Sequence, residues 1–108
     1  MDKRRPLPAS QGEKMRLTPR EREAIVTAVA AVDAAAEVYL FGSRAKDATR
    51  GGDIDLLVVS ALIDARTRRA IRRRIVDAIG EQKIDITAVP DMGDPFARLA
   101  KAGGVRLR

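Results

Sequence analysis

The segment "VYLFGSRAKDATRGGDIDLLVVS" spans residues 38–60 and places two apolar runs on either side of a loop rich in glycine and charge. The second run begins with Asp53 and Asp55, two carboxylates one residue apart at the start of an otherwise apolar strand. Removing an unpaired, ionised carboxylate from water is costly, so both residues require a compensating positive charge. A basic side chain, a ring of backbone amides or a metal ion can each supply that charge.

The sequence around this segment predicts an alternation of helices and strands. Three segments have the apolar runs or alternation typical of strands: 37–41, 53–60 and 83–89. Three others have helical spacing or helix-start signals: about 19–35, 65–79 and 95–101. The last residues, "GGVRLR", are expected to form a tail or an edge strand.

The ends of the predicted helices carry capping signals. Thr18 and Glu21 have the spacing of a capping box, and Pro19 suits the first helical position. Asp64 can cap the second helix, and Gly80 is expected to end it. The inner stripe of this second helix is predicted to consist of Ile71, Ile75, Ala78 and Ile79.

The order helix, strand, strand, helix, strand, helix predicts an α/β (α+β) fold, with a small mixed sheet of about three strands flanked by helices. The helical connection between the second and third strands favours parallel pairing, and the shorter link between the first two permits antiparallel pairing. A chain of 108 residues fits one domain, assigned to 17–108, preceded by a flexible basic arm at 1–16.

Composition narrows the possible chemistry. The chain has no cysteine and no histidine, which excludes disulfides, cysteine nucleophiles, imidazole bases and the usual zinc sites. Its net charge of +6 favours anionic partners such as nucleotides, nucleic acids or acidic proteins. Aromatic residues make up 3%, which argues against a stacking platform for single-stranded nucleic acid. No apolar stretch is long enough to span a membrane, and the lack of cysteine fits a cytoplasmic location.

Three carboxylates are candidates for one site. Asp53 and Asp55 lie two residues apart on a strand and therefore project from the same face. Asp85 lies in "KIDITAV" between Ile84 and Ile86, and it joins the first two carboxylates if the second and third strands are neighbours. A set of oxygen ligands fits Mg²⁺ or Mn²⁺, and two such ions form the clamp used for displacement at phosphorus.

The loop before the two aspartates has residues suited to binding phosphate. Gly42 lets backbone amides approach an anion closely, and Ser43 adds a hydroxyl donor. Arg44 and Lys46 lie where they can neutralise phosphate oxygens. A Gly-Ser pair is also common in ordinary turns, and an Asp-x-Asp pair is common at strand ends. The ordered combination of the pair, the two aspartates and a later aspartate is more specific.

The stretch "LFGSRAKDATRGGDIDLLVV" resembles the signature of the DNA polymerase beta-like nucleotidyltransferase superfamily, in particular its minimal nucleotidyltransferase (MNT) branch. The resemblance extends over about 17–89 and implies a palm-like fold that transfers a nucleoside monophosphate from ATP or another NTP to a hydroxyl. By position, Gly42 and Ser43 match the phosphate-binding pair. Asp53 and Asp55 match the metal-binding pair, and Asp85 matches the third carboxylate, which activates the acceptor.

The same resemblance implies a partner. Members of the minimal branch often pair with a small helical HEPN-type ribonuclease toxin and act as its antitoxin, and some transfer AMP to a tyrosine of that toxin. An enzyme of this type needs Mg²⁺ and ATP. The alternatives are a non-catalytic antitoxin that masks its partner by binding, and a nucleotidyltransferase that acts on nucleic acid.

Arginines on one helix face suggest a binding surface. They can contact a partner protein or RNA, and the alternative is a solvated helix surface. Arginine offers planar, bidentate contacts, which favours an interface. The residues are Arg66, Arg68, Arg69, Arg72, Arg73 and Arg74.

Overall fold

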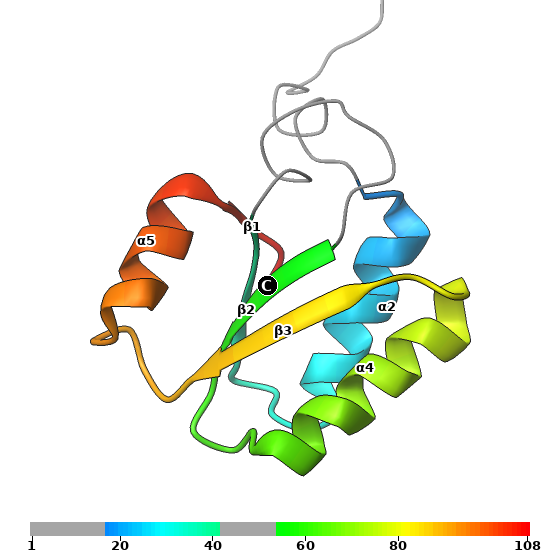
Figure 1. Ribbon diagram of the computed structural model, residues 1–108, viewed down its shortest axis with the longest axis horizontal. Helices are drawn as coiled ribbons and strands as arrows, with labels where there is room; N and C mark the ends of the chain where they lie inside the picture. Colours follow the sequence, from blue (N-terminus) through cyan, green and yellow to red (C-terminus); the bar gives the residue numbers. More distant parts are fainter. Residues whose placement is uncertain (1–16, 42–53) are drawn as a thin grey trace, which may run out of the picture.

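The computed structural model describes residues 17–41 and 54–108, and in this part of the chain four strands form one mixed sheet (Figure 1). The strands are arranged in the order β3-β2-β1-β4. Their bounds are Glu37–Phe41 for β1, Ile54–Val59 for β2, Ile84–Val89 for β3 and Val105–Arg106 for β4. The α/β fold is confirmed. The sheet has one strand more than the expected count, because the C-terminal segment forms an edge strand.

The pairing of the strands follows the prediction. β2 and β3 are parallel, and the connection between them contains the helix α4 (Ala65–Ile79). β1 runs antiparallel to β2 on one side and to β4 on the other. A parallel pair needs a long crossover, whereas an antiparallel pair does not.

The first helix, α2 (Pro19–Ala30), begins at the predicted cap and ends earlier than predicted. The Thr18 hydroxyl accepts the Glu21 N–H at 3.0 Å, and the Glu21 carboxylate accepts the Thr18 N–H at 3.0 Å. The expected extension to residue 35 is wrong. Asp33 accepts the Ala35 N–H at 2.9 Å, a local turn that competes with helical hydrogen bonding.

The second helix, α4, begins and ends at the predicted residues. The Asp64 carboxylate accepts the Thr67 N–H at 2.8 Å, and this hydrogen bond holds the pKa of Asp64 below its ordinary value. Gly80 ends the helix with a positive φ of 97°, a conformation that favours glycine. The expectation that Ala78 is part of the inner stripe is wrong, since Ala78 is exposed beside α2 and its carbonyl accepts an Arg20 hydrogen bond at 3.0 Å.

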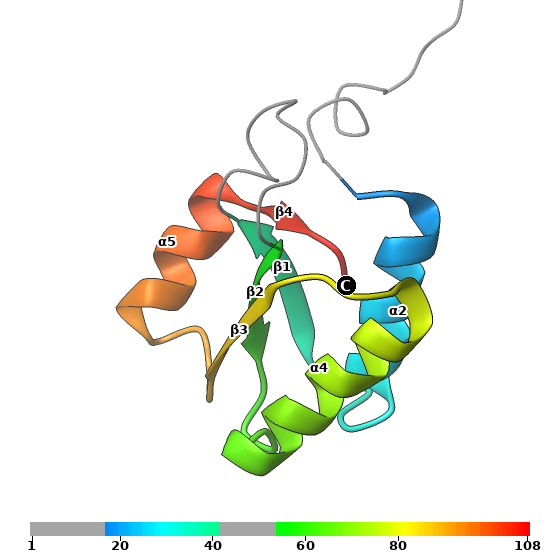
Figure 2. The same ribbon diagram turned by 45° about the vertical axis from the view of Figure 1, so that its right-hand side comes forward.

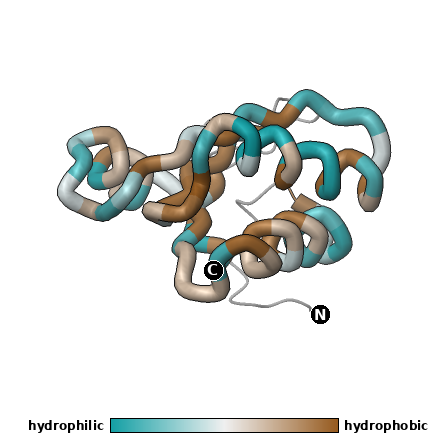
Figure 3. Tube along the Cα trace, turned by 90° about the horizontal axis from the view of Figure 1, so that it is seen from below, coloured by the Kyte–Doolittle hydropathy of each residue, from teal (hydrophilic) through white to brown (hydrophobic). Residues whose placement is uncertain are grey.

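Helices cover both faces of the sheet (Figures 1 and 2). On one face, α2 and α4 bury Ile25, Ile71 and Ile75 against Leu56 and its neighbours. On the other face, the helix α5 (Pro95–Gly103) buries Ala97 and Ala100 against the sheet. Figure 3 shows hydrophobic residues gathered along the strands and the inner sides of the helices. This two-sided cover explains why β2 is apolar on both faces.

The third helix begins where the sequence predicts. The Asp94 carboxylate caps α5 by accepting the Phe96 N–H at 2.8 Å, and Pro95 occupies the first turn. The helix continues two residues past the predicted end at Lys101. No helix in 17–41 or 54–108 has the length and apolar character needed to cross a membrane.

Candidate active site

Asp55 and Asp85 are direct neighbours across the parallel pair of β2 and β3. Adjacent strands lie about 4.8 Å apart, so the two backbones hold their side chains close together. Asp85 is exposed and Asp55 is half-buried. The predicted juxtaposition of these two carboxylates is confirmed at the level of strand register.

The alternation of side chains puts both carboxylates on the face opposite α2 and α4. Ile54 and Leu56 flank Asp55 in the sequence and belong to the core under those two helices. Ile84 and Ile86 flank Asp85 and pack in the same layer. Because successive residues of a strand point to opposite faces, Asp55 and Asp85 project on the side that α5 covers further along the sheet.

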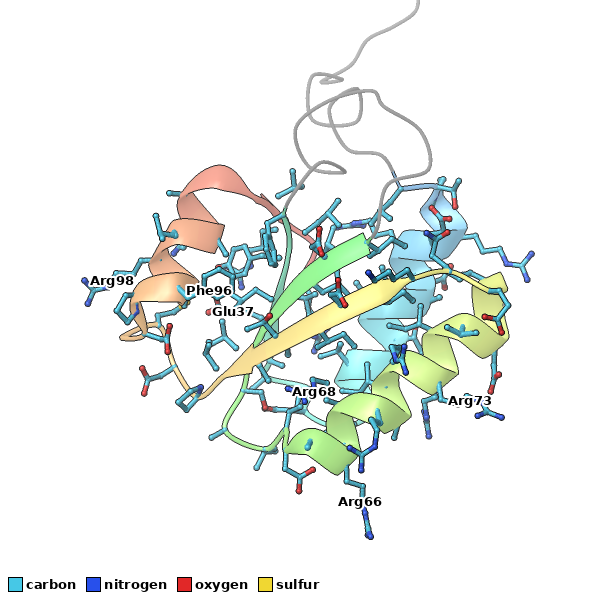
Figure 4. All side chains as sticks on the ribbon, viewed as in Figure 1. Glu37, Arg66, Arg68, Arg73, Phe96 and Arg98 are labelled. Atoms are coloured by element: carbon cyan, nitrogen blue, oxygen red, sulfur yellow. The ribbon has the colours of Figure 1, made fainter. Side chains whose placement is uncertain are left out.

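Phe41, Asp55 and Asp85 lie next to one another across three strands, and we call them the cross-strand row. An aromatic pair lies at one end of this row. Phe41, the last residue of β1, is the register partner of Asp55. Its ring meets the ring of Phe96 from α5 in an edge-to-face contact, with centroids 5.4 Å apart and planes at 84° (Figure 4). The end of the row on β1 is therefore apolar, and the other end, Asp85, lies on the outer strand β3. Sequence patterns do not reveal this aromatic neighbour, because its position depends on the antiparallel register of β1 with β2.

The remaining predicted site residues lie outside the described part of the chain. They are Gly42, Ser43, Arg44, Lys46 and Asp53. Gly42 follows Phe41 in the sequence, and Asp53 precedes Ile54, so both flank the strands that carry the row. Within the described residues, no group of three histidine, cysteine, aspartate or glutamate side chains has the arrangement of a metal site.

The oxygen donors of Asp55 and Asp85 suit a hard divalent cation. Asp55 and Asp85 offer only oxygen ligands, and the whole chain has no histidine or cysteine to add a softer one. Oxygen donors suit Mg²⁺ and Mn²⁺. Two carboxylates account for part of such a ligand set, and Asp53 is the third predicted member.

Tyr39 lies on the face of the sheet that α5 covers, and its hydroxyl is bonded to a carboxylate although the residue is buried. It is 1% exposed, and its hydroxyl donates a hydrogen bond to Glu37 Oε1 at 2.6 Å. The Arg106 guanidinium lies 5.9 Å from its ring centroid. Burial, together with the nearby Glu37 carboxylate, raises the pKa of Tyr39. The tyrosine is therefore neutral at physiological pH, and it packs in the core between the sheet and α5.

The predicted arginine surface on α4 divides into two parts. Arg66 and Arg73 point away from the ribbon, whereas Arg68 lies on the side of the helix that faces β3 (Figure 4). Arg73 pairs with Asp77 across one turn at 3.4 Å. Arg68, Arg69 and Arg72 line a groove against β3, which the sequence analysis did not predict.

Comparison with known proteins supports a transferase. A family model described as a nucleotidyltransferase domain matches residues 22–92, which include Asp55, Asp85 and residues 42–53. A search among curated proteins found no match.

Proposed function

Because the chain belongs to the nucleotidyltransferase domain family, we propose that it transfers AMP from ATP to a hydroxyl group, with Asp55 and Asp85 at the centre of the site. The observation that carries this proposal is that Asp55 and Asp85 are direct register partners on β2 and the outer strand β3. Family membership supports nucleotidyl transfer in general.

Asp53, Asp55 and Asp85 would hold the metal ions. When bound, two Mg²⁺ ions, or Mn²⁺ in their place, neutralise the charge that develops on the triphosphate and on the attacking oxygen. Asp85 has a second role as the base, because it is exposed and reachable by an acceptor. The edge-to-face pair of Phe41 and Phe96 lies at the β1 end of the same row.

Residues 42–46, at the start of the segment between β1 and β2, would hold the triphosphate. Gly42 and Ser43 offer a backbone amide and a hydroxyl, and Arg44 and Lys46 offer positive charge for the phosphate oxygens. Catalysis of this type depends on positioning and electrostatic stabilisation.

The reaction is a single displacement at phosphorus. The acceptor oxygen forms a bond to the α-phosphorus, and the bond from that phosphorus to the bridging oxygen breaks. Pyrophosphate leaves with the electron pair. The acceptor's proton passes to the carboxylate of Asp85 and from there to water.

The proposed acceptor is a tyrosine of a helical HEPN-type toxin in the cytoplasm, which makes the chain an antitoxin. The resemblance to the minimal branch supports this partner. The exposed arginines of α4 support a second candidate, transfer to RNA held on that surface.

An assay of labelled transfer tests the proposal. The chain is incubated with ATP labelled at the α-phosphate, Mg²⁺ and either a HEPN-type helical protein or RNA. We expect label on the helical acceptor protein. The rate of labelling should fall at least about 100-fold in Asp55→Asn and in Asp85→Asn, because each substitution removes the charge of a metal ligand. Asp77→Asn, which removes an exposed carboxylate from α4, is the control and should keep full activity.

The outcomes separate the candidate functions. Label on RNA and not on protein would favour the second candidate. If Asp55→Asn with Asp85→Asn still neutralises the toxin while transfer is lost, the antitoxin acts by binding. Equal labelling by the wild type and both single variants would contradict the proposed site.

A further inference from the structure

The strand β3 has an unpaired edge in the described part of the chain. It is the outer strand of the sheet, and β2 is its one neighbour there. The Ile54 N–H donates to the Lys83 carbonyl at 3.0 Å, and the Ser60 N–H donates to the Val89 carbonyl at 2.8 Å. Odd-numbered residues of β3 therefore direct their main-chain groups to β2. The N–H and C=O groups of the residues between them point to the open edge.

A groove runs beside this edge. It has a volume of about 470 Å³, and it is lined by Arg68, Arg69 and Arg72 of α4 and by residues 84–87 of β3. Figures 1 and 2 show α4 extending alongside β3, and Arg68, Arg69 and Arg72 of this helix line the groove with the strand. The groove thus combines a row of main-chain donors and acceptors with a row of positive charge.

The three arginines are available for an external anion. In the described part of the chain, the one ion pair on α4 joins Arg73 to Asp77 and involves none of them. All three side chains are exposed. The groove's single acidic residue is Asp85, which projects from the opposite face of the strand to Ile84 and Ile86.

The spacing of these features matches an extended chain. Arg68 and Arg72 are one helical turn apart, which is about 6 Å along the helix. Alternate residues of an added strand repeat about every 6.4 to 6.8 Å. Acidic side chains at alternate positions of such a strand meet the two arginines in succession while its backbone pairs with β3.

We propose that the edge of β3 and the arginines at 68, 69 and 72 form a docking site for an acidic, extended polypeptide segment of a partner protein, which adds a strand to the sheet. This mode of recognition takes affinity from main-chain hydrogen bonds and specificity from alternate side chains. Docking itself needs neither metal nor nucleotide, and Asp85 lies both in the groove and in the proposed transfer site.

Two other occupants fit the groove less well. A second copy of this chain paired edge to edge about a two-fold axis would bring its own arginines against these three, and like charges repel. A nucleic acid matches the charge, but its phosphates accept hydrogen bonds only and leave the carbonyls of the strand edge unpaired.

Binding of a designed peptide tests the proposal. The probe is a capped peptide as long as β3, six residues, that alternates glutamate and valine. Binding is measured by calorimetry without nucleotide, and contacts are mapped by amide NMR. We expect shifts at residues 84–88 and binding at least about tenfold weaker in the triple variant Arg68→Glu, Arg69→Glu, Arg72→Glu.

Control variants and control probes separate strand addition from simple charge attraction. The control triple Arg66→Glu, Arg74→Glu, Arg98→Glu changes the net charge equally away from the groove and should bind the peptide within about threefold of the wild type. Two further peptides carry N-methyl groups on either the glutamates or the valines. If the peptide adds as a strand, one N-methylated peptide should lose binding and the other should keep it, because the N–H groups of only one residue type face β3.

Several results would overturn the proposal. They are no binding of the peptide, equal binding by the two N-methylated peptides, and equal weakening by the two triple variants. Displacement of the peptide by a uridine oligonucleotide that needs the same arginines would assign the groove to nucleic acid instead.

Discussion

Asp55 and Asp85 show how a hydrophobic sheet can carry two charged residues in one row. Each aspartate lies between apolar neighbours that form the core or pack against it, so the strand keeps its core face while the opposite face holds a carboxylate. The period of two in the sequence was enough to predict which face each aspartate occupies. Their register, and the aromatic contact of Phe41 with Phe96, depend on long-range pairing that local patterns do not specify.

Tyr39 gives a prediction that absorbance can test directly, because it is the chain's single tyrosine. Burial and the Glu37 carboxylate raise its pKa in the folded state above the ordinary value of 10.0. Its stabilising contribution is therefore complete below pH 10.0 and is lost as pH rises through the folded pKa. An alkaline titration of the tyrosinate band should have a higher midpoint in the folded protein than in denaturant; coincident midpoints would refute the assignment.

Ser60 gives a prediction at acid pH. Its hydroxyl donates to Asp33 Oδ2 at 2.5 Å, and this bond, with the Ala35 N–H, lowers the pKa of Asp33 from 3.8. The resulting stability is present above pH 3.8 and is lost as pH falls through the folded pKa. Ser60→Ala should raise the pKa of Asp33 in an NMR titration and lower the urea midpoint most at neutral pH. Ser60→Thr keeps the hydroxyl and should change the pKa less.

At the scale of elements, the junction of α5 with β4 depends on a close backbone approach. A Cβ at Gly104 would lie 2.5 Å from the Ala100 carbonyl oxygen and 2.6 Å from that of Leu40. We expect Gly104→Ala to lower the free energy of unfolding by about 1–3 kcal/mol, because backbone must shift to admit the methyl group. Gly103→Ala meets nothing within 4 Å and is the control. Equal urea midpoints for the two variants would contradict this account.

The helix starts were more predictable than the helix ends. Thr18, Asp64 and Asp94 each act through a hydrogen bond to a nearby N–H, so the sequence alone contains the signal. The end of α2 is different, because Asp33 is also held by Ser60 from a distant part of the chain. The exposure of Ala78 likewise depends on where α2 packs, which helical periodicity does not reveal.

At the scale of the whole molecule, β2 is the centre of the fold and the support of the site. Leu56 of β2 is fully buried on the face of the sheet that α2 and α4 cover. Leu56→Ala should lower the free energy of unfolding by about 2–5 kcal/mol, a large part of the ~5–15 kcal/mol typical of a domain. Leu99→Ala, at a position 71% exposed on α5, should change it by less than about 0.5 kcal/mol. Chemical denaturation compares the two, and similar losses would contradict the two-layer core.

The fold class and the two carboxylates were predictable because both arise from alternation and element order. The groove between α4 and β3 was not, since it depends on how a helix face meets a sheet edge. Six arginines in the sequence indicated a charged surface, and the packing of α4 divided it into a groove side and a solvent side.

Binding of Mn²⁺ in the presence of a non-hydrolysable ATP analogue tests the central claim most directly, because it depends on neither acceptor nor turnover. Electron paramagnetic resonance should show bound Mn²⁺ in the wild type and in the control Asp77→Asn. Asp55→Asn and Asp85→Asn should each bind Mn²⁺ at least about tenfold more weakly, since each removes the negative charge and one oxygen of a carboxylate ligand. Equal Mn²⁺ affinity in the wild type and these two variants would show that the paired carboxylates of β2 and β3 are not the metal site.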